Sequence, residues 1–332
     1  MGRILEMASP VRLAASAAVG GYEERRGPYG EALDFCSPDD RFGAESFELA
    51  EAEMARMALF YALGKAGLAE GALDLVLSGD LQNQCVASSQ GPGSLSVPFL
   101  GLFGACSTMV EGLGIGALLL CGSPALTHVG VVTSSHNAAA ERQFRTPLEY
   151  GAQRPPTAQW TATAAGAVVM GRKGSMAALD AFLPGRVVDA GISDAANMGA
   201  AMAPAAADTL LAYFRESGEA VEDFDMIVTG DLGEEGSRLL LTLTAEALPT
   251  LGRRHADAGC LLYDKGRQDV HAGGSGCGCI AAMLSAVLLP GMQGHRYRRI
   301  LAVGTGALMN PASLQQGGSI AGVAHLVRLV EV

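Results

Sequence analysis

The sequence predicts an α/β protein that contains two copies of one unit, because three pairs of segments repeat in the same order along the chain. The first pair is LDLVLSGDL (73–81) and FDMIVTGDL (224–232), which both end in Gly-Asp-Leu. The second pair is two apolar stretches that each open on a cysteine. The third pair is AGAVVM (165–170) and AGVAHL (321–326). Strands and helices that alternate in this way favour an α/β fold.

The first pair predicts a buried strand with a helix before it in each copy. A short apolar run bounded by Gly-Asp is typical of a buried strand that ends in a turn. Before the first strand, the spacing of one helix face is seen in Met54, Met57, Ala58, Tyr61 and Ala62. The corresponding helix of the second copy is expected over residues 207–215.

The second pair predicts two buried helices, each followed by a strand. The helices are expected from Cys106 to about residue 120 and from Cys277 to about residue 289. Strands follow at residues 128–133 and 299–304, and corresponding residues of both elements are 171 apart. Equal offsets favour two halves related by a pseudo-twofold axis, residues 1–173 and 174–332.

The first of these helices is apolar on all sides, which is typical of a helix in a core. It also contains Gly112, Gly114 and Gly116, and glycine lowers helix propensity by about 1 kcal/mol relative to alanine. We therefore expect these glycines to allow the partner helix to approach closely at the pseudo-twofold axis.

Composition excludes several classes of protein. The net charge is −11 and the basic segment HRYRR (295–299) is short, so a nucleic-acid-binding surface is not indicated. The sequence has seven cysteines, which is an odd number, and we expect no signal peptide before them. Both observations favour a reduced, intracellular protein. The best uninterrupted apolar run, residues 112–120, is too short to span a bilayer, so only peripheral membrane association is expected.

Cys106 is the first candidate site residue. It lies where a loop enters a helix, and backbone N–H groups at a helix N-terminus favour a thiolate or a bound anion. His136 and Asn137 directly follow an apolar strand. Ligands of open α/β sheets bind beyond the carboxyl ends of the strands. The alternatives are an inert buried cysteine and a surface loop.

Charged residues add weaker candidates. Arg142 and Arg145 could hold carboxylates in a bidentate manner, although a salt-bridged helix face explains them equally well. Asp80 and Asp231 end equivalent strands, where a turn or cap is the favoured interpretation. The segment GGSGCG (273–278) lacks the spacing of a dinucleotide site, and its cysteines lack zinc-site spacing, so no metal is expected.

Several longer phrases resemble one family within the thiolase superfamily, the stage V sporulation protein AD family of spore-forming bacteria. They are GDLQNQ (79–84), FGACST (103–108), SSHN through ERQFR (134–145), NMG through PAAAD (197–208) and GGSGC (273–277). The resemblance covers about residues 27 to 325. It implies the thiolase-like, five-layered αβαβα fold with two pseudo-twofold related halves.

The resemblance also implies a function. The family is understood to bind dipicolinic acid and to serve its uptake into the developing spore together with other SpoVA membrane proteins. This implies a protein of the spore or forespore, peripheral at the inner membrane, with no cofactor. Its ligand would be dipicolinate. Because the net charge is −11, we expect either a local positive spot at Arg142 and Arg145 or delivery as the calcium chelate, with Asp80 or Asp231 facing the calcium. By analogy with thiolase-like proteins, a homodimer paired along an edge strand is expected.

The sequence departs from the condensing enzymes of the superfamily, although Cys106 corresponds to their nucleophile. Gly230-Asp231 stands where the synthase III branch has its histidine, and residues 273–275 read Gly-Gly-Ser where that branch has its asparagine. The turn 304–307 lacks the second cysteine of thiolases. We therefore predict a non-enzymatic binder. Its expected ligand-binding residues are Cys106, Ser107, His136, Asn137, Arg142 and Asp231. The alternatives are an acyl-transferase or condensing enzyme that uses Cys106, and a structural scaffold for membrane partners.

Overall fold

The strands of the two halves form one continuous mixed sheet in the computed structural model, which describes residues 3–144 and 154–332. Its order is β10-β9-β12-β13-β8-β1-β7-β5-β3-β4, and the short β2 (Phe35–Cys36) pairs with β1. The first-half strands are β1 (Leu5–Gly20), β3 (Leu75–Gly79), β4 (Phe99–Gly101), β5 (His128–Ser135) and β7 (Ala164–Gly171). The second-half strands are β8 (Ala177–Leu183), β9 (Met226–Thr229), β10 (His255–Asp257), β12 (Arg299–Leu308) and β13 (Ala321–Val330).

The same strand order occurs in both halves, which confirms the predicted duplication. The order β4-β3-β5-β7-β1 in the first half corresponds to β10-β9-β12-β13-β8 in the second. In each half the first three strands of this series are parallel and the last two are antiparallel to their neighbours. Antiparallel pairing of β1 with β8 joins the halves. The expected boundary at residue 173 lies in the loop between β7 and β8.

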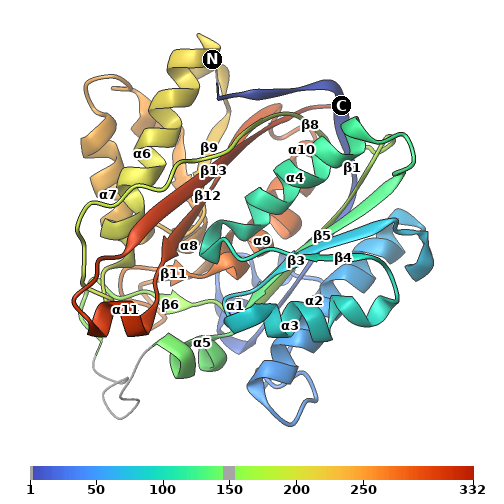
Figure 1. Cartoon of the computed structure of the whole chain (residues 1–332), viewed down its shortest axis with the longest axis horizontal. Helices are drawn as coiled ribbons and strands as arrows, with labels where there is room; N and C mark the ends of the chain where they lie inside the picture. Colours follow the sequence, from blue (N-terminus) through green and yellow to red (C-terminus); the bar gives the residue numbers. More distant parts are fainter. Residues whose placement is uncertain (1–2, 145–153) are drawn as a thin grey trace.

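Helices cover both faces of each half-sheet and give five layers (Figure 1). Helix α2 (Phe47–Ala66) packs on the outer face of the first half, and α6 (Met198–Ser217) and α7 (Gly233–Thr244) cover the second. Helices α4 (Thr108–Gly122) and α9 (Cys277–Met283) form the layer between them. Shorter helices connect the strands: α1 (Tyr22–Arg26), α3 (Val86–Gln90), α5 (Asn137–Phe144), α8 (Ala258–Leu262), α10 (Leu289–Gln293) and α11 (Pro311–Gln315).

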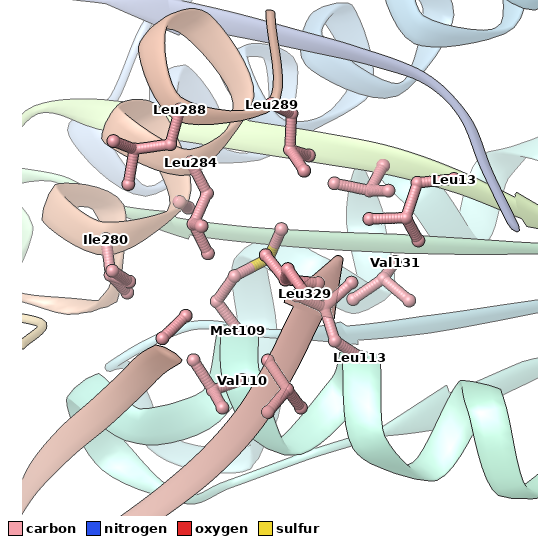
Figure 2. Close-up of a cluster of buried hydrophobic side chains, with 14 of the residues drawn as sticks. Leu13, Met109, Val110, Leu113, Val131, Ile280, Leu284, Leu288, Leu289 and Leu329 are labelled. Atoms are coloured by element: carbon pink, nitrogen blue, oxygen red, sulfur yellow. The ribbon is translucent and has the colours of Figure 1, made fainter. Parts of the chain in front are cut away.

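The central layer is the largest part of the core. Met109, Val110 and Leu113 of α4 lie opposite Ile280 and Leu284 of the second central helix (Figure 2). That second helix is longer and less regular than expected. It runs as α9, a π-helical turn (Leu284–Leu288) and α10, because the proline at position 290 has no N–H to donate within a regular helix.

The three glycines of α4 make room for side chains of the sheet, which corrects the expectation that they face the partner helix. A Cβ on Gly114 would lie 2.3 Å from the ring of Phe182 in β8. A Cβ on Gly112 would lie 2.8 Å from Val131 in β5. The glycines therefore lower the helix propensity of α4 but allow it to pack closely against the strands on both sides.

Helix Ala105–Gly122 is long and apolar enough to span a membrane by length and composition, although Glu111 interrupts its apolar residues. Much of it, 61% of the window, is buried inside the protein. An apolar surface on all sides is what a helix needs when it is packed between two sheets.

Candidate ligand site

A cavity of about 280 Å³ opens beside Cys106, at the carboxyl ends of the strands. Both halves contribute to it, so the site lies at their junction. Most of its wall is apolar. Its polar members are Asn83, Glu141, Gln159, Thr161, Ser275 and Asn310, and its apolar members include Leu81, Phe103, Phe144, Met198, Met202 and Met309.

Cys106 lies in a tight turn that is pressed against β12. It belongs to a 3-10 turn (Ala105–Ser107) before α4, and Ala105 has φ of 52°, a conformation that favours glycine. In β12, a Cβ on Gly304 would lie 2.8 Å from the carbonyl oxygen of Ser107, and a Cβ on Gly306 would lie 2.7 Å from that of Gly104. The glycines therefore let β12 reach the turn, and strained backbone of this kind is concentrated at functional sites.

Asp231 lies beneath Cys106, and both of its carboxylate oxygens are occupied. Oδ2 accepts the N–H of Gly276 at 2.7 Å and the hydroxyl of Ser275 at 3.3 Å. Oδ1 accepts the hydroxyl of Thr305 at 2.8 Å. The thiol of Cys106 lies near enough to this carboxylate for each group to affect the pKa of the other. Asp231 thus ties β9 to β12 and to the turn before α9.

Burial sets the electrostatics of this pair. It raises the pKa of Asp231 to about 7, against the opposing effect of the hydrogen bonds from Cys106, Gly276 and Thr305. Burial, followed by the charge of Asp231, raises the pKa of the Cys106 thiol well above its ordinary value. The arrangement disfavours a thiolate, contrary to the expectation from a helix N-terminus.

Ser107, an expected ligand-binding residue, is engaged within the turn. Its N–H donates to the carbonyl oxygen of Gly104 at 3.2 Å, and its hydroxyl donates to the same oxygen at 2.6 Å. The side chain is fully buried and does not line the cavity. Ligand binding by Ser107 stays a prediction, and in this structure its N–H and hydroxyl are engaged within the turn.

His136 is not among the residues that line the cavity, and its ring is hydrogen-bonded elsewhere. Its Nδ1 accepts the N–H of Ala138 at 3.2 Å, so Nε2 carries the hydrogen and donates to the carbonyl oxygen of Asp40 at 2.9 Å. The ring also stacks near Phe47, with centroids 5.2 Å apart. Burial lowers the pKa of His136. The histidine joins the end of β5 to the loop before α2.

Asn137 and Arg142 lie on α5 outside the cavity wall. Nδ2 of Asn137 is buried without a hydrogen-bond partner, and its backbone N–H donates to Thr163. Arg142 is 57% exposed and pairs with Glu48 at 3.2 Å, which is the salt-bridged helix face that was the alternative interpretation. Arg145 lies outside the described residues. Of the six expected residues, the structure brings together Cys106 and Asp231.

Sequence reasoning missed most of the cavity wall. Gln159 and Thr161 belong to a segment without any motif, and Gln159 donates to the carbonyl oxygens of Asp231 and Gly274, both at 2.7 Å. Thr161 pairs with Ser275 between the short strands β6 (Trp160–Thr161) and β11 (Gly274–Ser275). The sequence did contain one signal for this wall. The GGSGC phrase contains Ser275 and the ERQFR phrase contains Glu141, and both residues line the cavity.

Asp80, the first-half counterpart of Asp231, is a capping residue, as the favoured interpretation predicted. It accepts the N–H groups of Gln82 and Ser88, both at 2.8 Å, and the hydroxyl of Ser88 at 2.7 Å. Cys277, the counterpart of Cys106, donates its thiol to the carbonyl oxygen of Ser134 at 2.9 Å. Cys106 and Cys277 hold equivalent positions in the two halves, and the cavity described above lies beside Cys106. Within residues 3–144 and 154–332, no group of three His, Cys, Asp or Glu could hold a metal ion.

Comparisons with known proteins give both a family and a fold. A family model described as Stage V sporulation protein AD (SpoVAD) matches residues 2–330. The stage V sporulation protein AD of Bacillus subtilis (strain 168) is 38% identical over 316 residues, which cover 95% of this chain and 93% of that protein.

The similar solved structures are distant in sequence. Cerulenin-bound OleA of Xanthomonas campestris matches with a TM-score of 0.61 at 16% identity, over 98% of this chain and 99% of its own. The 3-oxoacyl-[acyl-carrier-protein] synthase III of Aquifex aeolicus VF5 matches with a TM-score of 0.55 at 13% identity, over 98% and 99% of the two chains. At these identities the likeness shows the fold alone, which is thiolase-like as the sequence predicted.

Proposed function

The chain belongs to the stage V sporulation protein AD family, and from that premise we propose that it is a non-enzymatic dipicolinate-binding component of the spore's SpoVA uptake system. The observation that carries the proposal is the cavity beside Cys106. Its volume of about 280 Å³ is at the small end of ligand pockets, which suits a compact planar molecule. Apolar walls with a few amide and hydroxyl groups suit an aromatic ring that carries polar substituents.

The charges around the cavity favour the calcium chelate over the free dianion. Among the described lining residues there is no Lys, Arg or His, and the wall includes the carboxylate of Glu141. Asp231 lies beneath the floor. The carboxylate of Glu141 would repel a free dianion, whereas calcium neutralises the two carboxylates of dipicolinate. Calcium prefers oxygen ligands, and of these three acids Glu141 lines the cavity, whereas Asp80 and Asp231 lie buried outside its wall.

The surroundings of Cys106 support the non-enzymatic part of the proposal. A condensing enzyme needs a base or an oxyanion donor next to its cysteine. Here the thiol lies near the carboxylate of Asp231, and His136, which follows the strand after the Cys106 helix, is hydrogen-bonded to Asp40. In this proposal the cavity binds a ligand, and Cys106 does not act as a nucleophile.

Isothermal titration calorimetry tests the proposal. We expect the protein to bind dipicolinate, and to bind it more tightly when calcium is present. Ala196→Leu adds three carbons to the cavity wall and should weaken binding by about tenfold or more, since bulk in a pocket typically costs a few kcal/mol. Arg142→Ala, on α5 outside the wall, is the matched control and should bind like the unaltered protein. Absence of binding in either form of the ligand would contradict the proposal.

The alternative function, acyl transfer by Cys106, makes a different prediction. The condensing enzymes among the similar structures share the fold and motivate this comparison. Incubation with an acyl-coenzyme A followed by mass spectrometry would then show a mass increase on the peptide that contains Cys106. A third outcome would favour a structural scaffold for membrane partners. In that case the protein binds no dicarboxylate but still associates with SpoVA proteins.

The proposed partners complete the assignment. Peripheral attachment at the inner membrane of the spore, through the SpoVA membrane proteins, follows from the family. A homodimer would pair through β4, which is the edge strand of the first half and exposes Leu100. Analytical ultracentrifugation of the protein with Leu100→Lys tests the dimer, because a charge on the paired edge should shift the protein to monomer.

A further inference from the structure

One stretch of the cavity wall belongs to a segment on the surface of the molecule. Residues 308–319 run from the end of β12 to the start of β13 and include α11. The cavity is lined by Leu308, Met309, Asn310 and Pro311, yet no residue of the segment is buried. Figure 1 shows α11 at the edge of the molecule, beyond the ends of β12 and β13. The segment therefore separates part of the cavity from solvent.

The segment forms hydrogen bonds mainly within itself. The N–H of Leu314 donates to the carbonyl oxygen of Asn310 at 3.1 Å, and the N–H of Gly318 donates to that of Ser313 at 2.9 Å. Asn310 caps α11, because its Oδ1 accepts the N–H of Ser313 at 3.0 Å. Pro311 suits the first turn of the helix, where its missing N–H is not needed. None of these bonds attaches the segment to the rest of the protein.

Side-chain contacts hold the segment in place. Met309 and Leu314 are partly buried and pack against the core of the second half. Near the end of the segment, the hydroxyl of Ser319 donates to Asp189 at 2.6 Å. Gly317 has φ of 85°, and nothing lies within 4 Å of a Cβ added there. An element with so little buried apolar surface can undock without unfolding the sheet, as ligand-binding loops commonly do.

Asn310 gives this segment a group that can hold the ligand. Because Oδ1 accepts from Ser313, the amide is oriented and its Nδ2 hydrogens remain for another acceptor. Nδ2 forms no hydrogen bond within the part of the chain that the structure describes. We infer that residues 308–319 form a lid that closes over the ligand, and that Asn310 donates an Nδ2 hydrogen to a ligand carboxylate. This inference rests on the proposed function, because it takes dipicolinate as the ligand.

Hydrogen–deuterium exchange measured by mass spectrometry tests the lid in the free protein. Isolated helices shorter than about 12–15 residues are marginal in water, so the amides of α11 exchange whenever the lid undocks. The matched reference is α8, which also has five residues but buries Ala258, Gly259 and Leu262, whereas α11 buries none. We expect α11 to exchange at least about tenfold faster than α8. Equal protection of the two helices would overturn the inference.

Dipicolinate should slow the exchange of the lid. At about ten times its dissociation constant, the ligand should slow exchange in α11 by about tenfold and leave that in α1 unchanged. Calorimetry on the same sample separates the two proposals. Binding without slower exchange in α11 would overturn the lid and leave the proposed function intact. Absence of binding would contradict the proposed function and the role of Asn310, and the exchange of the free protein would still decide whether the segment undocks.

Asn310→Ser removes the amide donor but keeps a capping oxygen, because serine caps helices about as well as asparagine. We expect the dissociation constant for dipicolinate to rise by about tenfold, which is the effect of losing a hydrogen bond to a charged group. Asn197→Ser is the matched control. Asn197 caps α6 by accepting the N–H of Ala200 at 3.2 Å, and it is not among the described residues that line the cavity. Unchanged affinity in Asn310→Ser, or an equal loss in both variants, would overturn the role of Asn310.

Discussion

The hydroxyl of Thr305 holds Asp231 at two atoms, accepting its backbone N–H at 3.1 Å and donating to its Oδ1 at 2.8 Å. Thr305 lies between Gly304 and Gly306, whose missing side chains let β12 touch the turn that carries Cys106. The Gly-Thr-Gly segment of the second half thus supports the turn that carries Cys106, beside the cavity at the junction of the two halves.

Thr305→Val should destabilise the protein without changing its fold. Valine has nearly the same shape but leaves the N–H and one carboxylate oxygen of Asp231 unpaired in the interior. We expect the free energy of unfolding to fall by about 1–3 kcal/mol in urea denaturation. Ser319→Ala removes an exposed hydroxyl that bonds Asp189 and should change stability by less than about 0.5 kcal/mol. Equal effects of the two changes would contradict the role of Thr305.

Gly114→Ala should be destabilising, because its Cβ would lie 2.3 Å from the ring of Phe182. We expect a loss of about 1–3 kcal/mol, typical of overpacking in a core. Gly64→Ala in α2 is the matched helical control, since nothing lies within 4 Å of the added Cβ. Greater helix propensity should make that variant more stable, by about 0.5–1 kcal/mol. Thermal melting of both variants measures the contrast.

His136→Ala should lower stability and leave ligand affinity unchanged. The change removes the hydrogen bond to Asp40 and the contact with the Phe47 ring, so a loss of about 1–3 kcal/mol in urea denaturation is expected. Because the ring does not line the cavity, the dissociation constant for dipicolinate should stay within about twofold of the unaltered value. A tenfold weaker affinity in a folded variant would return His136 to the binding site.

Stability should fall as pH rises from about 6.5 to about 8. Burial raises the pKa of Glu51 to about 8 and those of Glu24 and Asp231 to about 7. A raised pKa means that the folded state binds protons more tightly, so this contribution is lost as pH passes through the folded pKa. Burial lowers the pKa of His255 and His325 to about 4, which costs stability only below about pH 6.5.

Urea midpoints across that range measure the pH effect, with a slope of at most about 1.4 kcal/mol per pH unit for each group. Glu51→Gln should flatten the dependence. Asp189→Asn should not, because hydrogen bonds from Ser319 and Gly191 lower the pKa of that exposed carboxyl out of the range. Stability that rises between about pH 6.5 and about pH 8 would contradict the assignment of these buried acids.

The sequence was sufficient for the architecture because the two halves repeat local patterns. The paired Gly-Asp turns and cysteine-led helices located β3, β9, α4 and α9 within a few residues. It was not sufficient for the cavity wall. Cys106 meets Asp231 only after the halves fold together, and Gln159 carries no motif that would mark it. The glycines of α4 show the same limit, since their spacing cannot reveal which neighbour fills the space.

The pairing of β1 with β8 has a consequence for how such a chain can specialise. These strands hold equivalent places in the two halves and run antiparallel, which is the pairing that a twofold axis generates between identical subunits. The pairing of β1 with β8 therefore resembles the contact of a symmetric dimer, but it lies within one polypeptide. A true dimer must alter both of its sites together. Within one polypeptide the two equivalent positions can differ, and here a cavity opens beside Cys106 while Cys277 is fully buried with its thiol bonded to Ser134.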